Sequence, residues 1–194
     1  MKHVGLSRGM RKLFQVAVVM SVALGLGTSA AAATSATVQT IPISQLVNSG
    51  PLPPSPCTSN VTIKSLGSGY YVRTDVGGAG YFHAMLHAVA SAVGNQDLYT
   101  VCQGLYTTIQ SQANGMYVAV EPTYPRIYTS MLRARSSAVG AAEKFALHSC
   151  GTGCVAIRSY LNDTYVANEF WYSGTSHAIL RARSGGIGQF EKFQ

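Results

Sequence analysis

The chain has 194 residues, of which 47% are hydrophobic and 11% are charged. Its formal net charge is +7, but ten Lys or Arg and seven Asp or Glu remain beyond residue 12, an excess of only three. An excess this small gives no electrostatic case for nucleic-acid binding, so we expect no nucleic-acid partner.

The first 33 residues have the pattern of a secretory signal peptide. A basic start that includes Lys2 and Arg8 precedes an apolar run over residues 13–26, which is too short to span a bilayer. The alanines at 31–33 provide an A-x-A-type cleavage site. No later stretch is long enough for a membrane helix. We therefore expect residues 1–33 to be removed and the protein to be secreted, without a membrane span.

Residues 34–56 are rich in Ser, Thr and Pro, with four prolines between positions 51 and 56. This composition is typical of an extended linker. The alternative for part of this segment is that the apolar residues 41–43 dock on the following domain.

From Ile63 onward the sequence repeats itself three times, at offsets of 46 and then 48 residues, with no gap inside a repeat. The repeats cover about 61–103, 106–149 and 154–194. The matching triplets include Ile63, Ile109 and Ile157; Tyr71, Tyr117 and Tyr165; Leu86, Leu132 and Leu180; and Gly94, Gly140 and Gly188. Each repeat contains four short stretches with alternating apolar residues and β-branched or aromatic side chains, which predict strands.

Three four-stranded units cannot bury their apolar faces separately. Around a threefold axis they form a β-trefoil, in which six strands close a barrel and three hairpins cap one end, so that few strand edges stay exposed. The alternative, a β-propeller, would have only three blades, below the usual minimum of four. The sequence therefore predicts an all-β fold, with one monomeric β-trefoil domain over 57–194.

Four cysteines follow the predicted signal peptide, at Cys57, Cys102, Cys150 and Cys154. An even number in an exported chain predicts two disulfides. Of the three connectivities, we favour Cys57–Cys102, because these residues flank the first and last strands of repeat one. The other pair, Cys150–Cys154, encloses glycines that suit a tight turn. A zinc site is the rival interpretation, but no His or further Cys stands at ligand spacing, so no metal is expected.

The repeats resemble those of the fascin-type β-trefoil. The resemblance rests on Tyr-Val in the second strand, Leu-x-Ala in the third and Gly-x-x-Glu-Lys-Phe at the fourth, as in residues 114–121, 140–145 and 188–193. The first repeat departs from it at residues 97–99. Fascins bundle actin through several trefoils in one chain, so a single exported trefoil is not expected to share that activity. A second resemblance, in repeat length, is to the arabinose-binding trefoil modules of secreted glycosidases. The ricin-type Gln-x-Trp signature is absent.

Function is expected on loops where the repeats differ, and the segments between the second and third strands differ most. They are rich in aromatic residues, whose faces stack on the C–H faces of sugars. Trp171 and Tyr172 form the leading platform, with Glu169, Asn168 and Asp163 as hydroxyl acceptors. The other ligand-binding candidates are Tyr124, Tyr128 and Tyr81. The alternative role of the aromatic residues is to plug the hairpin end of the barrel.

Two sets of repeated charged residues are expected to have no role in chemistry. The acids Asp97, Glu143 and Glu191 lie too far apart around a threefold axis for paired catalysis, so we interpret them as structural or surface residues. The arginines of the third strands are expected on a solvated strand face in preference to an anion site. They are Arg133, Arg135, Arg181 and Arg183.

No set of nucleophile, base and orienting group is recognisable in the sequence, so we expect neither an enzyme nor a cofactor. The leading interpretation is a secreted carbohydrate-binding module that acts on extracellular polysaccharide or cell-surface glycan. The alternative is a protein-binding module, such as a protease inhibitor that uses residues 122–125 or a fascin-like cytoskeletal binder.

Overall fold

The structure, a computed structural model, describes residues 38–48, 57–124 and 128–194. The predicted signal peptide and residues 34–37 and 49–56 of the predicted linker lie outside the described residues. The strands are β1 (Ile41–Pro42), β2 (Cys57–Thr62), β3 (Tyr71–Asp75), β4 (Met85–Ala90), β5 (Tyr99–Gln103), β6 (Thr107–Ser111), β7 (Tyr117–Glu121), β8 (Met131–Ser136), β9 (Phe145–Gly151), β10 (Cys154–Ser159), β11 (Tyr165–Glu169) and β12 (Ile179–Ser184). The helical elements are α1 (Gln45–Asn48) and the short 3-10 turns Gly80–Phe82, Asn95–Asp97 and Gly174–Ser176. No helix in the part of the chain that the structure describes is long and apolar enough to cross a membrane.

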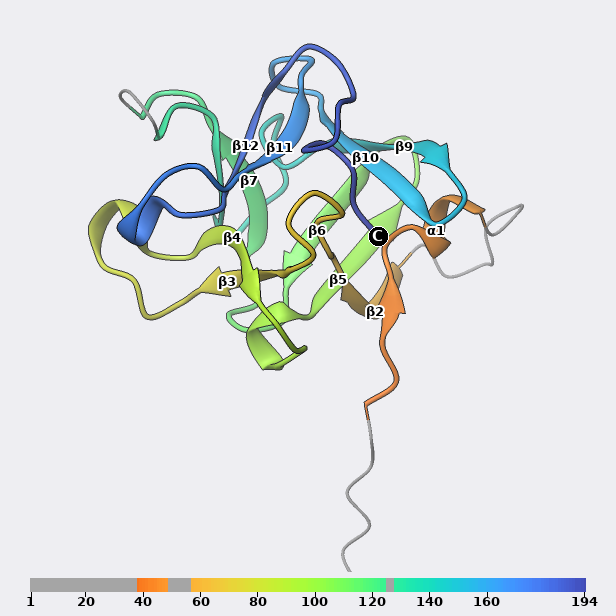
Figure 1. The fold of residues 1–194 in the computed structure, drawn as a ribbon, viewed down its shortest axis with the longest axis horizontal. Helices are drawn as coiled ribbons and strands as arrows, with labels where there is room; N and C mark the ends of the chain where they lie inside the picture. The colour runs from red at the N-terminus through yellow and green to blue at the C-terminus, as the bar shows by residue number, and fades with distance from the viewer. Residues whose placement is uncertain (1–37, 49–56, 125–127) are drawn as a thin grey trace, which may run out of the picture. The chain divides into compact units, whose positions relative to one another are not determined.

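The strands form a barrel closed at one end by three hairpins, as the repeats predict (Figure 1). The barrel pairings run β2–β5, β5–β6, β6–β9 and β9–β10, all antiparallel. Phe193 completes the ring through bridges to Ser65 and Val155, so the last expected strand is reduced to a short bridge. The hairpin strands β4, β8 and β12 pair with one another in a triangle, β4–β8, β8–β12 and β12–β4. This arrangement is the β-trefoil.

The core consists of the residues that repeat in the sequence. Five equivalent positions are buried in all three repeats: Ile63, Ile109 and Ile157; Val72, Val118 and Val166; Leu86, Leu132 and Leu180; Ala88, Ala134 and Ala182; and Tyr99, Phe145 and Phe193. Tyr99 replaces Phe at its position, and its hydroxyl donates to the Val72 carbonyl inside the core, at 3.3 Å. Burial raises the pKa of Tyr99 well above its ordinary value, so the phenol stays neutral.

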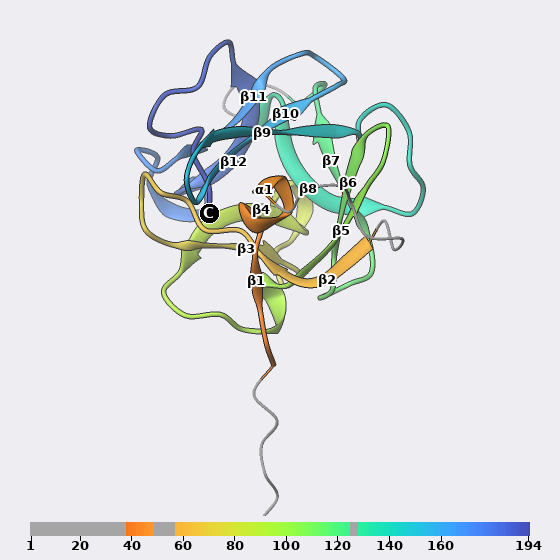
Figure 2. The same ribbon diagram turned by 90° about the vertical axis from the view of Figure 1, so that its right-hand side faces the viewer.

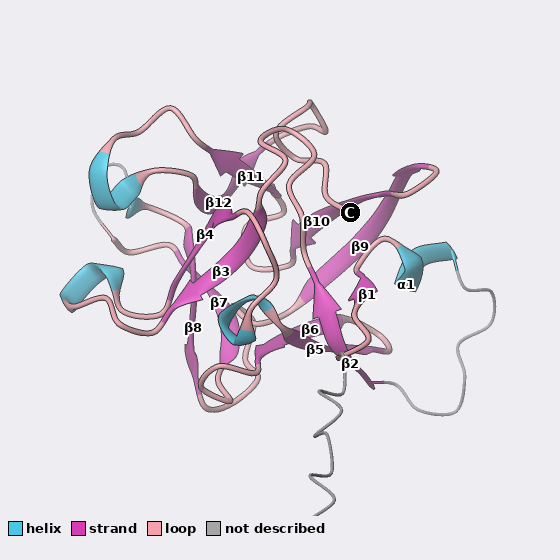
Figure 3. Cartoon of the chain, turned by 60° about the horizontal axis from the view of Figure 1, so that its bottom comes forward, coloured by secondary structure: helices cyan, strands magenta, loops and turns pink. Residues whose placement is uncertain are grey.

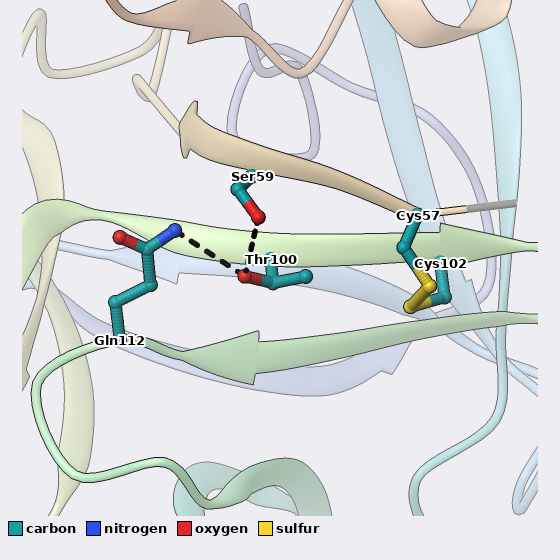
Figure 4. Close-up of a disulfide and its surroundings, with 5 residues drawn as sticks. All are labelled: Cys57, Ser59, Thr100, Cys102 and Gln112. Carbon is teal, nitrogen blue, oxygen red and sulfur yellow. Dashed lines mark hydrogen bonds between the residues drawn. A yellow bond between two sulfur atoms is a disulfide. The ribbon is translucent and has the colours of Figure 1, made fainter. Parts of the chain in front are cut away.

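Both predicted disulfides are confirmed. Cys57 lies directly opposite Cys102 in the β2–β5 pairing and is bonded to it (Figure 4). Cys150 and Cys154 close the turn between β9 and β10. Two disulfides are typical of proteins that fold in an oxidising compartment.

Part of the predicted linker belongs to the domain, which corrects its boundaries. Strand β1 pairs in parallel with β2, and the Ile43 amide donates to the Thr62 carbonyl at 2.9 Å. Ile43 is 0% exposed, and Leu46 and Val47 of α1 pack against the barrel core. In Figure 2, α1 lies in front of the ring of strands. Burial of these apolar side chains outweighs the Ser, Thr and Pro composition of their flanks.

Replacing Ile43 with Val is expected to lower the free energy of unfolding by about 1 kcal/mol, because it removes one buried methyl group. Urea unfolding of the purified protein measures this loss. Val38→Ala, at an exposed position nearby, is the control and should leave stability unchanged. Equal stability of Ile43→Val and the parent would show that residues 41–48 behave as a linker in solution.

Candidate ligand-binding site

Most of the candidate tyrosines meet at the hairpin end of the barrel, where they form a plug. Three fully buried residues at equivalent positions, Met85, Met131 and Ile179, form its base. Packed against them are the partly buried Phe82, Tyr124, Tyr128 and Tyr172. Tyr81 lies on the outside of this cluster, with its ring centroid 5.1 Å from that of Tyr124 and 5.9 Å from that of Tyr128. The plug interpretation therefore holds for these residues. Figure 3 shows helical turns of the connecting loops at the opposite end of the domain from α1.

Trp171 lies at the edge of the plug, beside Tyr172, and is 52% exposed. Its ring meets those of Phe170 and Phe190 at steep angles, with centroid distances of 6.0 and 5.4 Å. Tyr172 is also adjacent, at 6.0 Å. These neighbours hold the indole in place while about half of its surface faces solvent.

Asn168 and Glu169 are both buried. The Asn168 amide donates to the hydroxyls of Ser65 and Ser68, at 2.9 and 2.8 Å, and so ties β11 to the first repeat. Asn168 is therefore not a surface acceptor, which corrects the sequence-based expectation. The Glu169 carboxylate accepts hydrogen bonds from Arg181 and Arg183.

The arginines of the third strands divide into two kinds, and the expectation of a solvated face is wrong for one of them. Arg133 and Arg181 are buried, and each Nε donates to a carbonyl of a neighbouring hairpin, that of His83 or Thr129, at 2.8 Å. Alternation of side chains along an isolated strand does not predict the burial of these arginines. They are covered because β4, β8 and β12 converge in the hairpin triangle.

Arg135 and Arg183 have half-exposed side chains, as expected. Each guanidinium pairs with a glutamate on the adjacent strand, Arg135 with Glu121 and Arg183 with Glu169. The hydrogen bond to the glutamate raises the pKa of each arginine above its ordinary value. The guanidinium groups of Arg135 and Arg183 are therefore held in place and remain partly exposed, whereas the carboxylates of Glu121 and Glu169 are nearly buried.

The structural interpretation of the repeated acids is confirmed. Each carboxylate accepts a hydrogen bond from the backbone amide of the glycine three residues earlier, at 2.6–2.7 Å. The pairs are Asp97 with Gly94, Glu143 with Gly140 and Glu191 with Gly188. This bond holds the turn before the fourth strand of each repeat.

Two pockets occupy equivalent places in the second and third repeats. The pocket of the third repeat has a volume of about 240 Å³, and that of the second about 370 Å³. The third is lined by Ala167, Glu169, Trp171, Arg183, Ser184 and Glu191. The residues at the same six positions line the second, namely Ala119, Glu121, Thr123, Arg135, Ser136 and Glu143. At these six positions the two pockets differ only where Trp171 replaces Thr123, and the second pocket is also lined by Val120, Pro122 and Ala142.

The first repeat has different side chains at these positions. Arg73 replaces the alanine of the other two repeats, and its guanidinium bonds both carboxylate oxygens of Asp97, at 3.0 and 3.3 Å. Val89 replaces the pocket arginine. The first repeat therefore lacks both the small residue and the charged donor that characterise the two pockets.

The third-repeat pocket combines three kinds of group suited to a polyhydroxylated ligand. The indole of Trp171 offers an apolar face, Arg183 offers donors and Glu191 offers an acceptor, while Glu169 lines the pocket with its carboxylate bonded to Arg181 and Arg183. Sequence reasoning singled out Trp171 and Glu169, but it assigned Arg183 to a solvated strand face, interpreted Glu191 as structural and did not consider Ser184. The sequence does contain one signal for these pockets: Ala119 and Ala167 occupy the position at which the first repeat has Arg73. Within residues 38–48, 57–124 and 128–194, no group of three or more His, Cys, Asp or Glu side chains is placed to hold a metal ion.

Solved structures similar to this chain include β-trefoils, whereas no protein-family model and no curated protein sequence matches it. The designed threefold-symmetric protein ThreeFoil superposes with a TM-score of 0.57 at 14% identity, covering 69% of this chain and 94% of its own. The ricin B-like lectin of Macrolepiota procera, solved in complex with lactose, gives 0.53 at 14%, covering 74% and 96%. An exo-β-1,3-galactanase from Clostridium thermocellum gives 0.58 at 14%, but the match covers only 30% of that chain and 74% of this one. Identities this low show the fold alone: the chain is a β-trefoil, and the likeness does not extend to the fascin family in particular.

Proposed function

We propose that the protein is a secreted glycan-binding module whose principal site is the third-repeat pocket beside Trp171. The observation that carries the proposal is the only tryptophan of the chain, half exposed at the rim of a pocket lined by Arg183, Glu169 and Glu191. An exposed aromatic ring next to a few fixed polar groups is a common design for binding sugars, since the ring covers C–H faces and the polar groups bind hydroxyls.

The pocket is largely organised before any ligand arrives. Phe170 and Phe190 hold the indole of Trp171, and the ion pair with Glu169 holds Arg183. Glu191 is fixed by its hydrogen bond from Gly188. Little side-chain entropy is then lost on binding, which favours affinity for a small contact area.

The chemistry of the pocket favours a neutral ligand. Arg183 is already paired with Glu169, and Glu191 adds a second carboxylate, so there is no excess of positive charge for an anion. A sugar hydroxyl can donate to a carboxylate and accept from a guanidinium, and so can use both kinds of group.

Similar structures suggest which glycans to test first. The Macrolepiota procera lectin was solved with lactose, and two other similar structures are an exo-β-1,3-galactanase and an endo-β-galactosidase from Clostridium perfringens. Galactose-containing glycans are therefore the first probes. The two disulfides and the signal-peptide pattern support secretion.

Trp171→Ala is expected to weaken glycan binding about tenfold or more, which corresponds to losing about 1.4 kcal/mol of stacking. Purified protein is tested for retention on insoluble β-1,3-galactan, xylan, chitin and cellulose, and on a glycan array that includes lactose. Tyr81→Ala is the matched control, since Tyr81 is equally exposed but lies outside the pocket. Undiminished binding by a folded Trp171→Ala variant would reject this site.

The alternative of a protease-inhibiting loop gains no specific support. Pro122 and Thr123 are exposed, but the Tyr124 side chain turns into the plug, where its hydroxyl accepts a hydrogen bond from Arg133 at 2.6 Å. Pro125 lies outside the described residues. If a folded protein were retained on no glycan, the proposed function would be rejected, and a panel of proteases would be the next test.

A further inference from the structure

A second surface with the features of a binding site lies on β9 and β10 of the barrel. Two adjoining pockets, of about 220 and 230 Å³, share Ala146 and Tyr160 in their linings. Tyr160 is 56% exposed and stands between them. We call this surface the Tyr160 groove; it shares no lining residue with the Trp171 pocket.

One half of the groove carries exposed apolar and aromatic side chains on a lining that is otherwise largely polar. It is lined by Leu105 and Tyr106 from the β5–β6 turn and by Leu147 of β9. Leu105 is 96% exposed, and Tyr106 is also exposed, with the Lys144 ammonium 4.5 Å from its ring centroid. Large apolar side chains gathered at the surface in this way mark contact sites.

The other half has donors and acceptors side by side within a lining that is more apolar than polar. Arg158 Nη2 donates to the Asp163 carboxylate at 2.6 Å, and His148 lines the same pocket. Arg158 Nε is buried and has no hydrogen-bond partner among the residues that the structure describes. The ring of Tyr165 supports both groups, 5.7 Å from the guanidinium carbon and 5.7 Å from the His148 ring centroid.

The equivalent place in the preceding repeat shows what a closed version looks like. There Gln112 stands in place of Tyr160, and Thr100 in place of Ala146. The Gln112 amide donates to Thr100 Oγ1 and to the Tyr99 carbonyl, both at 3.2 Å, and Ser59 bonds Thr100 at 3.3 Å (Figure 4). These polar groups satisfy one another, whereas in the third repeat Tyr160 and Asp163 extend into solvent and Arg158 keeps an unused donor.

We propose that the Tyr160 groove is a second glycan-binding site, which holds successive rings of a neutral polysaccharide chain. One ring lies against Tyr160, with hydroxyls on Arg158 and Asp163, and the next extends over Tyr106 and Leu105. The Arg158–Asp163 pair carries little net charge and so does not attract an anionic ligand, while its polarity opposes a purely apolar partner. The Lys144 ammonium beside Tyr106 adds a single positive charge, and its contact with the ring leaves the aromatic surface for a neutral sugar. The groove shares the ligand class of the proposed function, on which it rests, but does not require Trp171.

Tyr160→Ala tests the groove, in the parent protein and in the Trp171→Ala background. The probes are soluble β-1,3-galactan for a long chain and lactose for a short ligand, with affinity measured by gel retardation and by titration. Loss of one stacking ring is expected to weaken polymer binding about tenfold. Lactose binding in the Trp171 pocket should change less than twofold. Tyr160→Phe should retain polymer affinity, and Tyr70→Ala, an exposed tyrosine outside the groove, is the control.

The outcomes separate the groove from the principal site. Unchanged polymer affinity of Tyr160→Ala in both backgrounds overturns the groove and leaves the Trp171 pocket standing. Polymer affinity lost in Tyr160→Ala but kept in Trp171→Ala supports the groove and rejects the principal site. A folded parent protein that binds none of the polysaccharides rejects both. Thermal unfolding of each variant shows whether a loss of binding reflects a loss of fold.

Discussion

Cys57→Ser combined with Cys102→Ser is expected to lower the free energy of unfolding by about 4 kcal/mol. The bond spans 45 residues and joins β2 to β5, the first and last strands of repeat one. Closing a loop of this length removes much of the entropy of the unfolded chain, and the estimate follows from that loss. A domain with ordinary stability would lose a large part of its total, so a fall in the melting temperature by many degrees should accompany the change.

The matched control is the other disulfide. Cys150 and Cys154 are only four residues apart, so Cys150→Ser with Cys154→Ser should cost about 2 kcal/mol in the same framework. Urea unfolding followed by the fluorescence of the single tryptophan, Trp171, measures both variants. The loop-entropy argument would be contradicted if removing the Cys150–Cys154 bond lowered the free energy of unfolding as much as, or more than, removing the Cys57–Cys102 bond.

The sequence predicts the barrel and its core well, because the physical requirement repeats three times. A position such as Ile63, Ile109 and Ile157 is apolar in every repeat since each copy fills the same layer of one core. The Cys57–Cys102 bond follows from the same logic, because antiparallel pairing of β2 with β5 brings the two residues together.

Contacts made outside the repeat could not be predicted in the same way. Residues 41–48 have no counterpart in the other repeats, and their packing depends on the barrel already being formed. The burial of Arg133 and Arg181 arises where three hairpins converge, which a strand-by-strand reading of one sequence does not show.

The candidate sites lie where the threefold symmetry breaks. Arg73 fills in the first repeat the position that Ala119 and Ala167 leave small in the others, and Trp171 replaces Thr123 in only one of the two pockets. Similarly, Tyr160 replaces a glutamine that bonds its own neighbours. The β-trefoil fold requires none of these differences, so the positions that differ are the best candidates for contacts with a ligand.

Glu169→Ala is expected to destabilise the protein by about 3–5 kcal/mol, because it leaves a buried charge without its partner. Arg181 is only 3% exposed, and its Nη1 donates to the Glu169 carboxylate at 3.1 Å. After the substitution its remaining partners are the Thr129 carbonyl and the Tyr172 hydroxyl, which carry no compensating charge. Urea unfolding of the variant and its parent measures the loss.

Arg183→Ala is the control, since it removes the half-exposed partner of the same glutamate and should cost less than about 1 kcal/mol. The pair of variants separates the two roles of this corner of the pocket. Glu169 holds the fold, so a loss of glycan binding in Glu169→Ala would say nothing about recognition, whereas a loss in the stable Arg183→Ala variant would report the ligand contact directly. If Glu169→Ala were no less stable than Arg183→Ala, then Arg181 would not depend on Glu169 for its burial, and Glu169 would become a direct candidate for binding sugar hydroxyls.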